Sequence, residues 1–200
     1  MADNPISALH RLRATSGPKE TVGLSDEVIM DFCSTDNELV QAIHEAVGVH
    51  QTLMEEFGQD IMSLPEAELI QHLQSDYVNF YSAATVNPYI PIAGRGPWLV
   101  TACGAVLHDN GGYGMLGSGH GPSSIIDAMS ENWVMANVMT PSFSQKRLGD
   151  RLRKELGHTR GSCRFDRFIC MNSGSVSVTC LLYTSPSPRD RTRSRMPSSA

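Results

Sequence analysis

One short segment constrains the fold of this 200-residue chain more than any other. It is the apolar run FICM, residues 168–171, which leads directly into Asn172, Ser173, Gly174 and Ser175. An apolar run without polar alternation is typical of a strand in a sheet that is covered on both faces. The residues after the turn have the composition of a helix start. The segment therefore predicts a buried strand, then a turn, then a helix.

The turn Ser173-Gly174-Ser175 has the composition of an anion-binding loop. Glycine lets the backbone approach an anion closely, and successive N–H groups and serine hydroxyls point outward at a helix N-terminus. An ordinary junction in which a serine caps the helix explains the same residues. The turn by itself therefore leaves phosphate binding and simple capping open.

The N-terminal half of the chain has a helical pattern. From Ser25 to Tyr81 apolar residues recur at helical spacing, with a break and a new N-cap at Thr35 or Asp36. A later helix is expected to begin with Ser63 as its cap and with Pro65 in its first turn. This half therefore predicts a helical region that follows a mobile N-terminus.

Strands are predicted in the middle of the chain. Prolines at 88, 91 and 97 exclude a helix and favour an extended segment. Residues 98–109 then predict two strand pieces, broken near Cys103-Gly104, that form a hairpin. The segment GGYGMLGSGHGP, residues 111–122, is a glycine-dense loop.

Two helices are predicted after that loop. The first begins at Pro122 or Ser123, and its inward face is expected to contain Ile125, Ile126, Met129 and Trp133. The second covers residues 141–157, with Gly157 as its C-cap. Its apolar stripe is formed by residues at i, i+4 and i+8, namely Leu148, Leu152 and Leu156.

Charge and hydropathy limit the partners. The net charge is −5, and because residues 180–200 contribute +3 the remainder carries −8. That acidic body argues against a nucleic-acid partner. No stretch approaches the roughly 18 apolar residues of a membrane helix, and the N-terminus lacks the apolar core of a secretory signal. We expect a cytoplasmic protein without a membrane partner, with organellar targeting as the alternative.

The five cysteines of the chain show no CxxC pair and no histidine at metal-ligand spacing. Such cysteines are typical of reduced thiols in a cytosol-like compartment. We therefore expect no metal site.

Two other motifs have simpler explanations. The residues from Gly112 to Gly117 match G-x-G-x-x-G, but the expected helix starts only at Pro122 instead of directly after the glycines. A nucleotide-binding module is therefore an alternative only. His120 is a candidate general base or a hydrogen-bonding residue. His108 and Asp109 are adjacent in a strand and point to opposite faces, so they do not form a dyad.

One part of the chain resembles the class III, pyridoxal-phosphate-dependent aminotransferases, and it contains, in sequence order, NPYIPIAGRGPW, GSGHGPSSIIDAM and FICMNSGS. This family includes the ornithine, acetylornithine, lysine and ω-amino-acid transaminases. The resemblance covers residues 87–179, about half of the chain. It implies an α/β fold of type I, with a small N-terminal part and a large domain around a mostly parallel seven-stranded sheet. It also implies a homodimer.

The resemblance assigns roles by position. Ser173, Gly174 and Ser175 match the loop that holds the phosphate of pyridoxal 5′-phosphate, and Tyr89 is a candidate for lining the substrate channel. The implied reaction transfers an amino group from an amino acid or amine to a 2-oxo acid. Val176 departs from the family pattern, which has glutamate at that position.

That reaction needs a lysine that binds the cofactor, and the family places it downstream of the turn. The chain has only Lys19, Lys146 and Lys154, none in the expected setting. No catalytic residue is therefore assigned, and the chain is expected to be an inactive fragment. The alternative is a shortened, non-catalytic partner of a full-length transaminase.

Residues 180–200 resemble translated adapter DNA instead of the aminotransferase family. CLLYTSPSPRD can be back-translated into the adapter of transposase-based sequencing libraries, and SRMPSSA fits the flow-cell end of the same adapter. Thr179 is then the last native residue. The expected organisation is a flexible N-terminus (1–24), a helical extension (25–86), a small aminotransferase part (87–135), the start of the cofactor-binding domain (136–179) and a non-native disordered tail (180–200).

Overall fold

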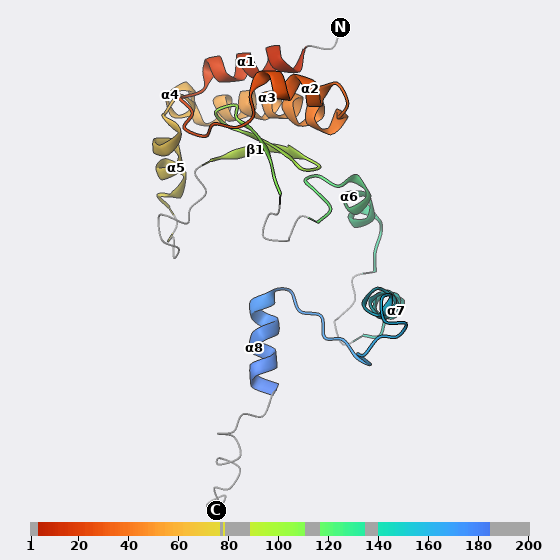
Figure 1. Cartoon of the computed structure of the whole chain (residues 1–200). Helices are drawn as coiled ribbons and strands as arrows, with labels where there is room; N and C mark the ends of the chain where they lie inside the picture. The colour runs from red at the N-terminus through yellow and green to blue at the C-terminus, as the bar shows by residue number, and fades with distance from the viewer. Residues whose placement is uncertain (1–3, 77, 79–88, 111–116, 135–139, 185–200) are drawn as a thin grey trace, which may run out of the picture. The chain divides into compact units, whose positions relative to one another are not determined.

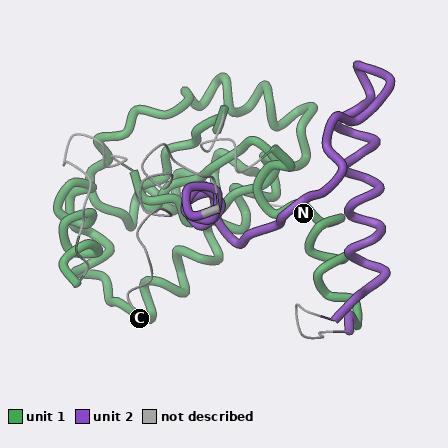
Figure 2. The backbone as a smooth tube through the Cα atoms, turned by 90° about the horizontal axis from the view of Figure 1, so that it is seen from below, with its two compact units in different colours: residues 1–132 green, residues 133–200 purple. Residues whose placement is uncertain are grey.

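The computed structural model describes residues 4–76, 78, 89–110, 117–134 and 140–184. Contacts between residues divide the chain into two compact units, unit 1 (residues 1–132) and unit 2 (residues 133–200) (Figure 2). The described residues contain eight helices and one three-stranded antiparallel sheet (Figure 1). The mixture of helix and strand agrees with the predicted class.

Unit 1 contains six of these helices and the whole sheet. Its elements are α1 (Pro5–Thr15), α2 (Asp26–Cys33), α3 (Asn37–Phe57), α4 (Gln59–Met62), α5 (Glu66–Gln74), β1 (Pro91–Arg95), β2 (Trp98–Thr101), β3 (Val106–His108) and α6 (Ser123–Ser130). Unit 2 contains α7 (Phe143–Gly157) and α8 (Gly174–Thr184). None of the described helices combines the length and apolar character that crossing a membrane requires.

Residues Pro5–Thr15 form helix α1, so the prediction of a flexible segment over residues 1–24 is wrong for them, and residues 1–3 lie outside the described residues. Asn4 caps α1 by accepting a hydrogen bond from the Ile6 N–H, and Pro5 stands at the start of the helix. Leu9 and Leu12 of α1 are buried. The short apolar stripe of this helix supplies part of the core, which the sequence prediction overlooked.

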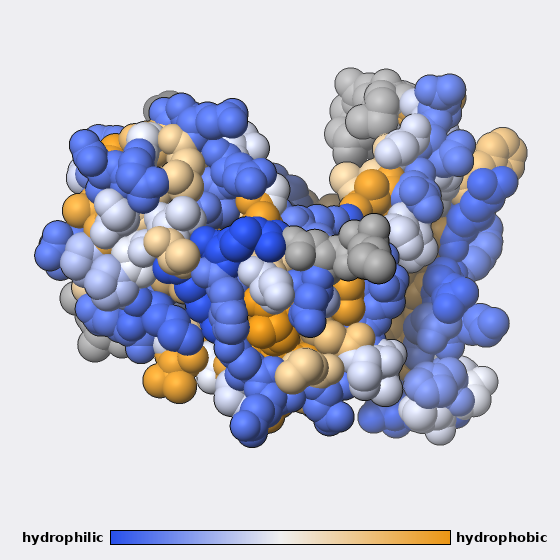
Figure 3. Space-filling view, turned by 90° about the horizontal axis from the view of Figure 1, so that it is seen from above, coloured by the Kyte–Doolittle hydropathy of each residue, from blue (hydrophilic) through white to orange (hydrophobic). Residues whose placement is uncertain are grey.

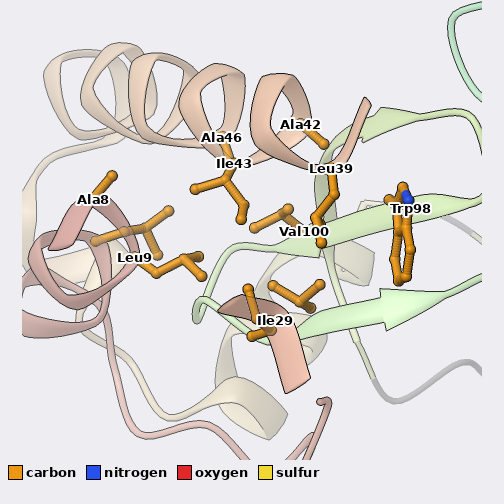
Figure 4. Close-up of a cluster of buried hydrophobic side chains, with 11 residues drawn as sticks. Ala8, Leu9, Ile29, Leu39, Ala42, Ile43, Ala46, Trp98 and Val100 are labelled. Carbon is orange, nitrogen blue, oxygen red and sulfur yellow. The ribbon is translucent and has the colours of Figure 1, made fainter. Parts of the chain in front are cut away.

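The core of unit 1 lies between the helices and one face of the sheet (Figure 4). Helix α3 packs against β1 and β2, and α1 packs against α3. The buried side chains come from α1, α2, α3 and the strands, and they include Leu9, Ile29, Leu39, Ile43, Trp98 and Val100. On the side that carries α1–α3 the exposed surface is mostly hydrophilic (Figure 3), as expected of helices that turn their apolar stripe toward a sheet.

The predicted helix break before α3 is confirmed. The Asp36 side chain accepts a hydrogen bond from the Glu38 N–H and so caps α3. Its second oxygen accepts a hydrogen bond from the Trp98 indole at 2.7 Å, which ties the cap to β2. The predicted start of α5 is only partly right, because Pro65 stands at the N-cap position while Ser63 ends α4.

The sheet is a meander in the order β1-β2-β3, with both pairs antiparallel. The predicted hairpin with a break at Cys103-Gly104 is β2–β3. Gly104 has φ +73°, and a Cβ atom there would lie 2.5 Å from the Arg13 Cγ atom. The turn therefore needs glycine for both conformation and space.

Arg13 links α1 to the β2–β3 turn and to the start of α2. Its Nε donates to the Gly104 carbonyl at 2.8 Å, and its Nη1 pairs with Asp26 at the start of α2 at 2.7 Å. Hydrogen bonds from Arg13 and from His10 hold the pKa of the Asp26 carboxyl below its usual range.

Ser16 and His50 form a second link between the helices and the sheet. His50 is 2% exposed, and its Nε2 lies 2.9 Å from the Ser16 Oγ. The same Oγ lies 2.8 Å from the carbonyl oxygens of Leu12 and Ala102. Because carbonyl oxygens only accept hydrogen bonds, the Ser16 hydroxyl donates to one of these two carbonyls. The Ser16 oxygen can then accept a hydrogen bond from the Nε2–H group of His50.

The stability of unit 1 is expected to decrease as the pH falls below about 6.5. Burial lowers the pKa of His50 from its ordinary value of 6.5, so the unfolded chain binds more protons than the folded chain in this range. The free energy of unfolding should be flat above this pH and should decrease below it. Urea denaturation between pH 8 and 5 measures the effect.

The matched controls for this pH effect are His50→Asn and His72→Asn. His72 is an exposed residue of α5. The loss of stability between pH 7 and 5.5 should shrink in the His50 variant and persist in the His72 variant. Equal pH dependence in both variants would count against a role for His50.

Helix α6 begins at Ser123 with Pro122 at its cap, as predicted. The predicted inward face is wrong, because Ile125, Ile126, Met129 and Trp133 are between 43% and 77% exposed. The apolar stripe is present in the sequence, but no described element covers it.

In unit 2, α7 occupies the predicted range. Ser142 caps it by accepting a hydrogen bond from the Gln145 N–H, and the C-cap is His158, one residue after the predicted Gly157. Leu148 and Leu156 remain about half exposed.

The predicted strand over residues 168–171 is absent; these residues are described without regular structure, and Ile169 is 76% exposed. A strand satisfies its backbone groups only beside another strand. The described residues of unit 2 contain no strand that could pair with this run.

Helix α8 extends through Thr184, so the prediction of disorder from residue 180 is wrong for its first five residues. The residues TCLLYT contain no proline or glycine, and the first proline that can end the helix is Pro186. Residues 185–200 lie outside the described part of the chain.

Candidate functional site

The Ser173-Gly174-Ser175 turn forms the N-terminal end of α8. The Val176 N–H donates to the Ser173 Oγ at 3.2 Å, and the Ser177 N–H donates to the Ser173 carbonyl at 3.0 Å. Ser173 is therefore the N-cap of the helix. The capping interpretation of the turn is confirmed, and phosphate binding stays a prediction.

The geometry leaves room for an anion beside the cap. The first N–H groups of a helix have no partner within the helix, and here they belong to Gly174 and Ser175, which are both exposed. A Cβ atom built on Gly174 meets nothing within 4 Å. The donors at this end are thus two backbone amides and the Ser175 hydroxyl, on an open surface.

Val176 leaves this end of α8 without the negative charge that glutamate would bring to the same position. It lies in the first turn of α8, is 42% exposed, and the first turn contains no acidic residue. A carboxylate there would interact favourably with the helix dipole, whereas valine contributes no charge. The N-terminus therefore keeps its positive potential for an external anion.

Two of the three lysines of the chain form hydrogen bonds away from the Ser173 turn. Lys146 binds both carboxylate oxygens of Asp150 at 2.5 Å, and its hydrogen bond holds the pKa of Asp150 below the usual range. Lys19 donates to the Val22 carbonyl at 3.2 Å in unit 1. Lys154 is exposed on α7. None of them hydrogen-bonds to the turn among the described residues.

The Ser173-Gly174-Ser175 turn can be compared with the groups that pyridoxal 5′-phosphate needs for binding. Backbone amides and hydroxyls at a helix N-terminus fit its phosphate. The ring end has no counterpart in the described residues of unit 2, since the two lysines of this unit do not contact the turn. The site therefore fits the phosphate end of the cofactor alone.

Tyr89, the candidate for the substrate channel, is half-buried just before β1. It belongs to unit 1, and the Ser173 turn belongs to unit 2. Its role in a substrate channel stays a prediction.

His120 pairs with a residue that the sequence reasoning did not connect to it. Its Nε2 lies 3.1 Å from the Asp109 carboxylate, and both side chains are 19% exposed. Backbone hydrogen bonds to Gly96, at 2.7 and 3.0 Å, fix its main chain. His108 instead contacts Asn110, and its ring stands perpendicular to the Trp98 ring. The hydrogen-bonding interpretation of His120 is favoured, and the rejected His108-Asp109 dyad is absent.

The sequence did not indicate the role of Arg95 either. Its Nε donates to both carboxylate oxygens of Glu45, at 3.0 and 3.1 Å, and its Nη1 donates to the Gly121 carbonyl. This pair fixes the end of β1 to α3. The two residues are 50 positions apart, so no local pattern could indicate the contact.

The cysteines offer no activated nucleophile in the core. All five lie in the described residues and none forms a disulfide. Burial raises the pKa of the Cys103 thiol to about 11, with a further contribution from Glu66. In the described residues no three metal-ligating side chains lie together. Of the Gly112 to Gly117 motif, only Gly117 lies within the described residues.

Comparisons of the chain with protein-family models, with curated proteins and with solved structures found no match.

Proposed function

We propose that this chain is the N-terminal part of a class III, pyridoxal-phosphate-dependent aminotransferase. The complete protein would transfer an amino group from an amino acid or amine to a 2-oxo acid, as a homodimer. The observation that supports this proposal is the Ser173-Gly174-Ser175 turn at the N-terminal end of α8, preceded by the hairpin, α6 and α7 in the family's order.

In this proposal the chain contributes the phosphate-binding end of the site. Ser173 holds the first turn of α8 in place through its contact with Val176. The amides of Gly174 and Ser175 and the Ser175 hydroxyl bind the phosphate and so orient the cofactor. When bound, pyridoxal phosphate supplies an electron sink for amino transfer. The residue that attaches to it would lie in the remainder of the protein.

Replacing Ser175 by aspartate should weaken phosphate binding at least tenfold. The new carboxylate would occupy the anion position and repel a phosphate. The ligand for this test is pyridoxine 5′-phosphate, which lacks the aldehyde that reacts with surface lysines. Its binding to the full chain is measured by titration calorimetry, with pyridoxine as the comparison.

The matched control is Ser177→Asp, which adds the same charge two residues later in α8. It should leave the affinity within about threefold, because helix-terminus effects are confined to the first turn. Equal binding of pyridoxine and its phosphate, or equal effects of both substitutions, would remove the phosphate site from the proposal.

A shortened partner of a full-length transaminase is the second candidate, and the helical order of residues 180–184 is the observation that favours it. If the chain is such a shortened partner, we expect residues 180–200 to be encoded in the source genome.

A further inference from the structure

A cavity lies between the end of α1 and the second half of α3 in unit 1. Its volume is about 400 Å³, which lies within the roughly 300–1,000 Å³ of small-molecule sites. The two helices pack against each other (Figure 1). The residues that line the cavity come from both helices, and they include Leu12, Ala14, Thr15, Val47, His50 and Met54. The phosphate-binding role proposed for unit 2 does not use this cavity.

Most of the cavity wall away from solvent is apolar. Leu12 is 2% exposed, Val47 packs against the core of unit 1, and Met54 is half-buried. The exposed lining residues mark the opening of the cavity, and they are Arg11, Ala14, Thr15 and Gln51. The Thr15 hydroxyl is engaged within α1, where it lies 3.2 and 3.1 Å from the carbonyl oxygens of Arg11 and Leu12. An apolar molecule therefore fits the wall.

His50 is the buried polar residue of this wall, and its hydrogen bonds determine which ring nitrogen carries the hydrogen. The Ser16 hydroxyl has one hydrogen, which it donates to the carbonyl oxygen of Leu12 or Ala102, both 2.8 Å away. The Nε2 atom of His50, 2.9 Å from Ser16, is therefore the donor of that pair. A neutral imidazole has only one N–H group. The other nitrogen, Nδ1, is thus a hydrogen-bond acceptor.

The Nδ1 atom of His50 faces the cavity. In the described part of the chain it has no hydrogen-bond partner. The polar side-chain atoms that are fully enclosed there without a partner are Arg13 Nη2 and Glu66 Oε1, so Nδ1 is in contact with open space. The open space that His50 borders is this cavity. Because an unpaired acceptor costs free energy, a ligand that donates a hydrogen bond to Nδ1 gains affinity.

Water alone fits this cavity poorly. A buried water molecule typically makes roughly two to four hydrogen bonds to polar groups of the protein. Among the described lining residues, His50 is the one buried polar side chain, since Arg11, Thr15 and Gln51 are exposed. Cavities with apolar walls instead take up apolar molecules such as aromatic rings. The wall and the single acceptor together favour an apolar ligand with one donor group.

We propose that this cavity binds a neutral phenol, an aromatic molecule with one hydroxyl group. The hydroxyl donates a hydrogen bond to His50 Nδ1, and the ring occupies the apolar part of the cavity. Met54 favours a ring over an alkyl chain, because thioether sulfur makes favourable contacts with aromatic rings. A charged ligand would lose its hydration against the apolar wall. Arg11, the one charged residue of the described lining, is exposed.

The test measures the binding of 2-naphthol to the full chain at neutral pH, through the fluorescence anisotropy of the compound. The comparison is its methyl ether, 2-methoxynaphthalene, which has the same rings but no hydrogen to donate. The full chain should bind 2-naphthol about tenfold more tightly than the ether, because the ether leaves the His50 acceptor without a partner.

The first variant, His50→Phe, keeps an aromatic ring and removes the acceptor. Its affinity for 2-naphthol should decrease about tenfold, while its affinity for the ether should stay within about threefold of that of the unchanged chain. The preference for the hydroxyl compound should therefore disappear. A merely structural effect of the substitution would weaken the binding of both compounds equally. Circular dichroism checks that the variant folds.

A second pair of variants tests the proposal without changing His50. Ala14 is exposed and lines the cavity, so the large ring of Ala14→Trp should fill the opening and weaken the binding of both compounds about tenfold. The matched control, Ala128→Trp, adds the same ring at an exposed position of α6, outside the lining. It should leave both affinities within about threefold.

Four results would overturn the proposal. No binding of 2-naphthol would mean that the cavity holds only water. Equal affinities of the full chain for 2-naphthol and its ether would show that His50 does not recognise the hydroxyl group. Equal effects of the two tryptophan substitutions would place the binding elsewhere. Tighter binding of 2-naphthoate than of 2-naphthol would assign the cavity to an anion. None of these results depends on pyridoxine phosphate binding.

Discussion

Replacing Trp98 by alanine is expected to lower the free energy of unfolding of unit 1 by about 3–5 kcal/mol. The Trp98 ring is 2% exposed, packs 5.0 Å from the Phe32 ring, and its indole N–H donates to Asp36 at 2.7 Å. The substitution opens a cavity in the core and leaves the cap of α3 without its link to β2. Urea denaturation followed by far-ultraviolet circular dichroism measures the loss.

The control for Trp98 is the other tryptophan of the chain. Trp133 is 53% exposed, so Trp133→Ala should change the free energy of unfolding by less than about 0.5 kcal/mol. A third variant, Trp98→Phe, keeps most of the ring but loses the donor to Asp36, and it should cost about 1–3 kcal/mol. Similar effects at positions 98 and 133 would mean that the core between α3 and the sheet is not formed.

Replacing Glu66 by alanine should destabilise unit 1 by about 2–4 kcal/mol. Glu66 is 1% exposed, and one of its oxygens accepts hydrogen bonds from the Glu20 and Thr21 N–H groups, both at 2.7 Å. The carboxylate thereby fixes the segment between α1 and α2 to the start of α5. Without it, two backbone donors lose their partner.

Glu68 is the matched control, because it lies in the same first turn of α5 and is exposed. Glu68→Ala should have an effect within about 0.5 kcal/mol. Amide hydrogen exchange adds a local readout: the Glu20 and Thr21 amides should exchange faster in Glu66→Ala and stay protected in Glu68→Ala. Unchanged protection in both variants is the result that would contradict the role of Glu66.

Local features of the fold were predictable from the sequence. Asp36 as a helix cap, the hairpin broken at Gly104 and the start of α6 after Pro122 each depend on a few adjacent residues. Such signals act through backbone conformation and capping, which neighbouring residues determine. The structure confirms all three.

Features that depend on distant partners were not predictable in this way. The Arg95–Glu45 pair, the His120–Asp109 pair and the Glu66 contacts join residues between 11 and 50 positions apart. The strand predicted over residues 168–171 failed for the same reason, because its apolar run indicates burial only if a neighbouring strand is present. Of the candidate site, the sequence predicted the helix start at Gly174.

The proposed aminotransferase function is tested most directly by the nucleotide sequence of the source genome across codon 179 and downstream of it. The proposal predicts a reading frame that continues into sequence different from Cys180 onward, with alternating strand and helix patterns and a lysine to bind the cofactor. A genome that encodes CLLYTSPSPRDRTRSRMPSSA followed by a stop codon would contradict it.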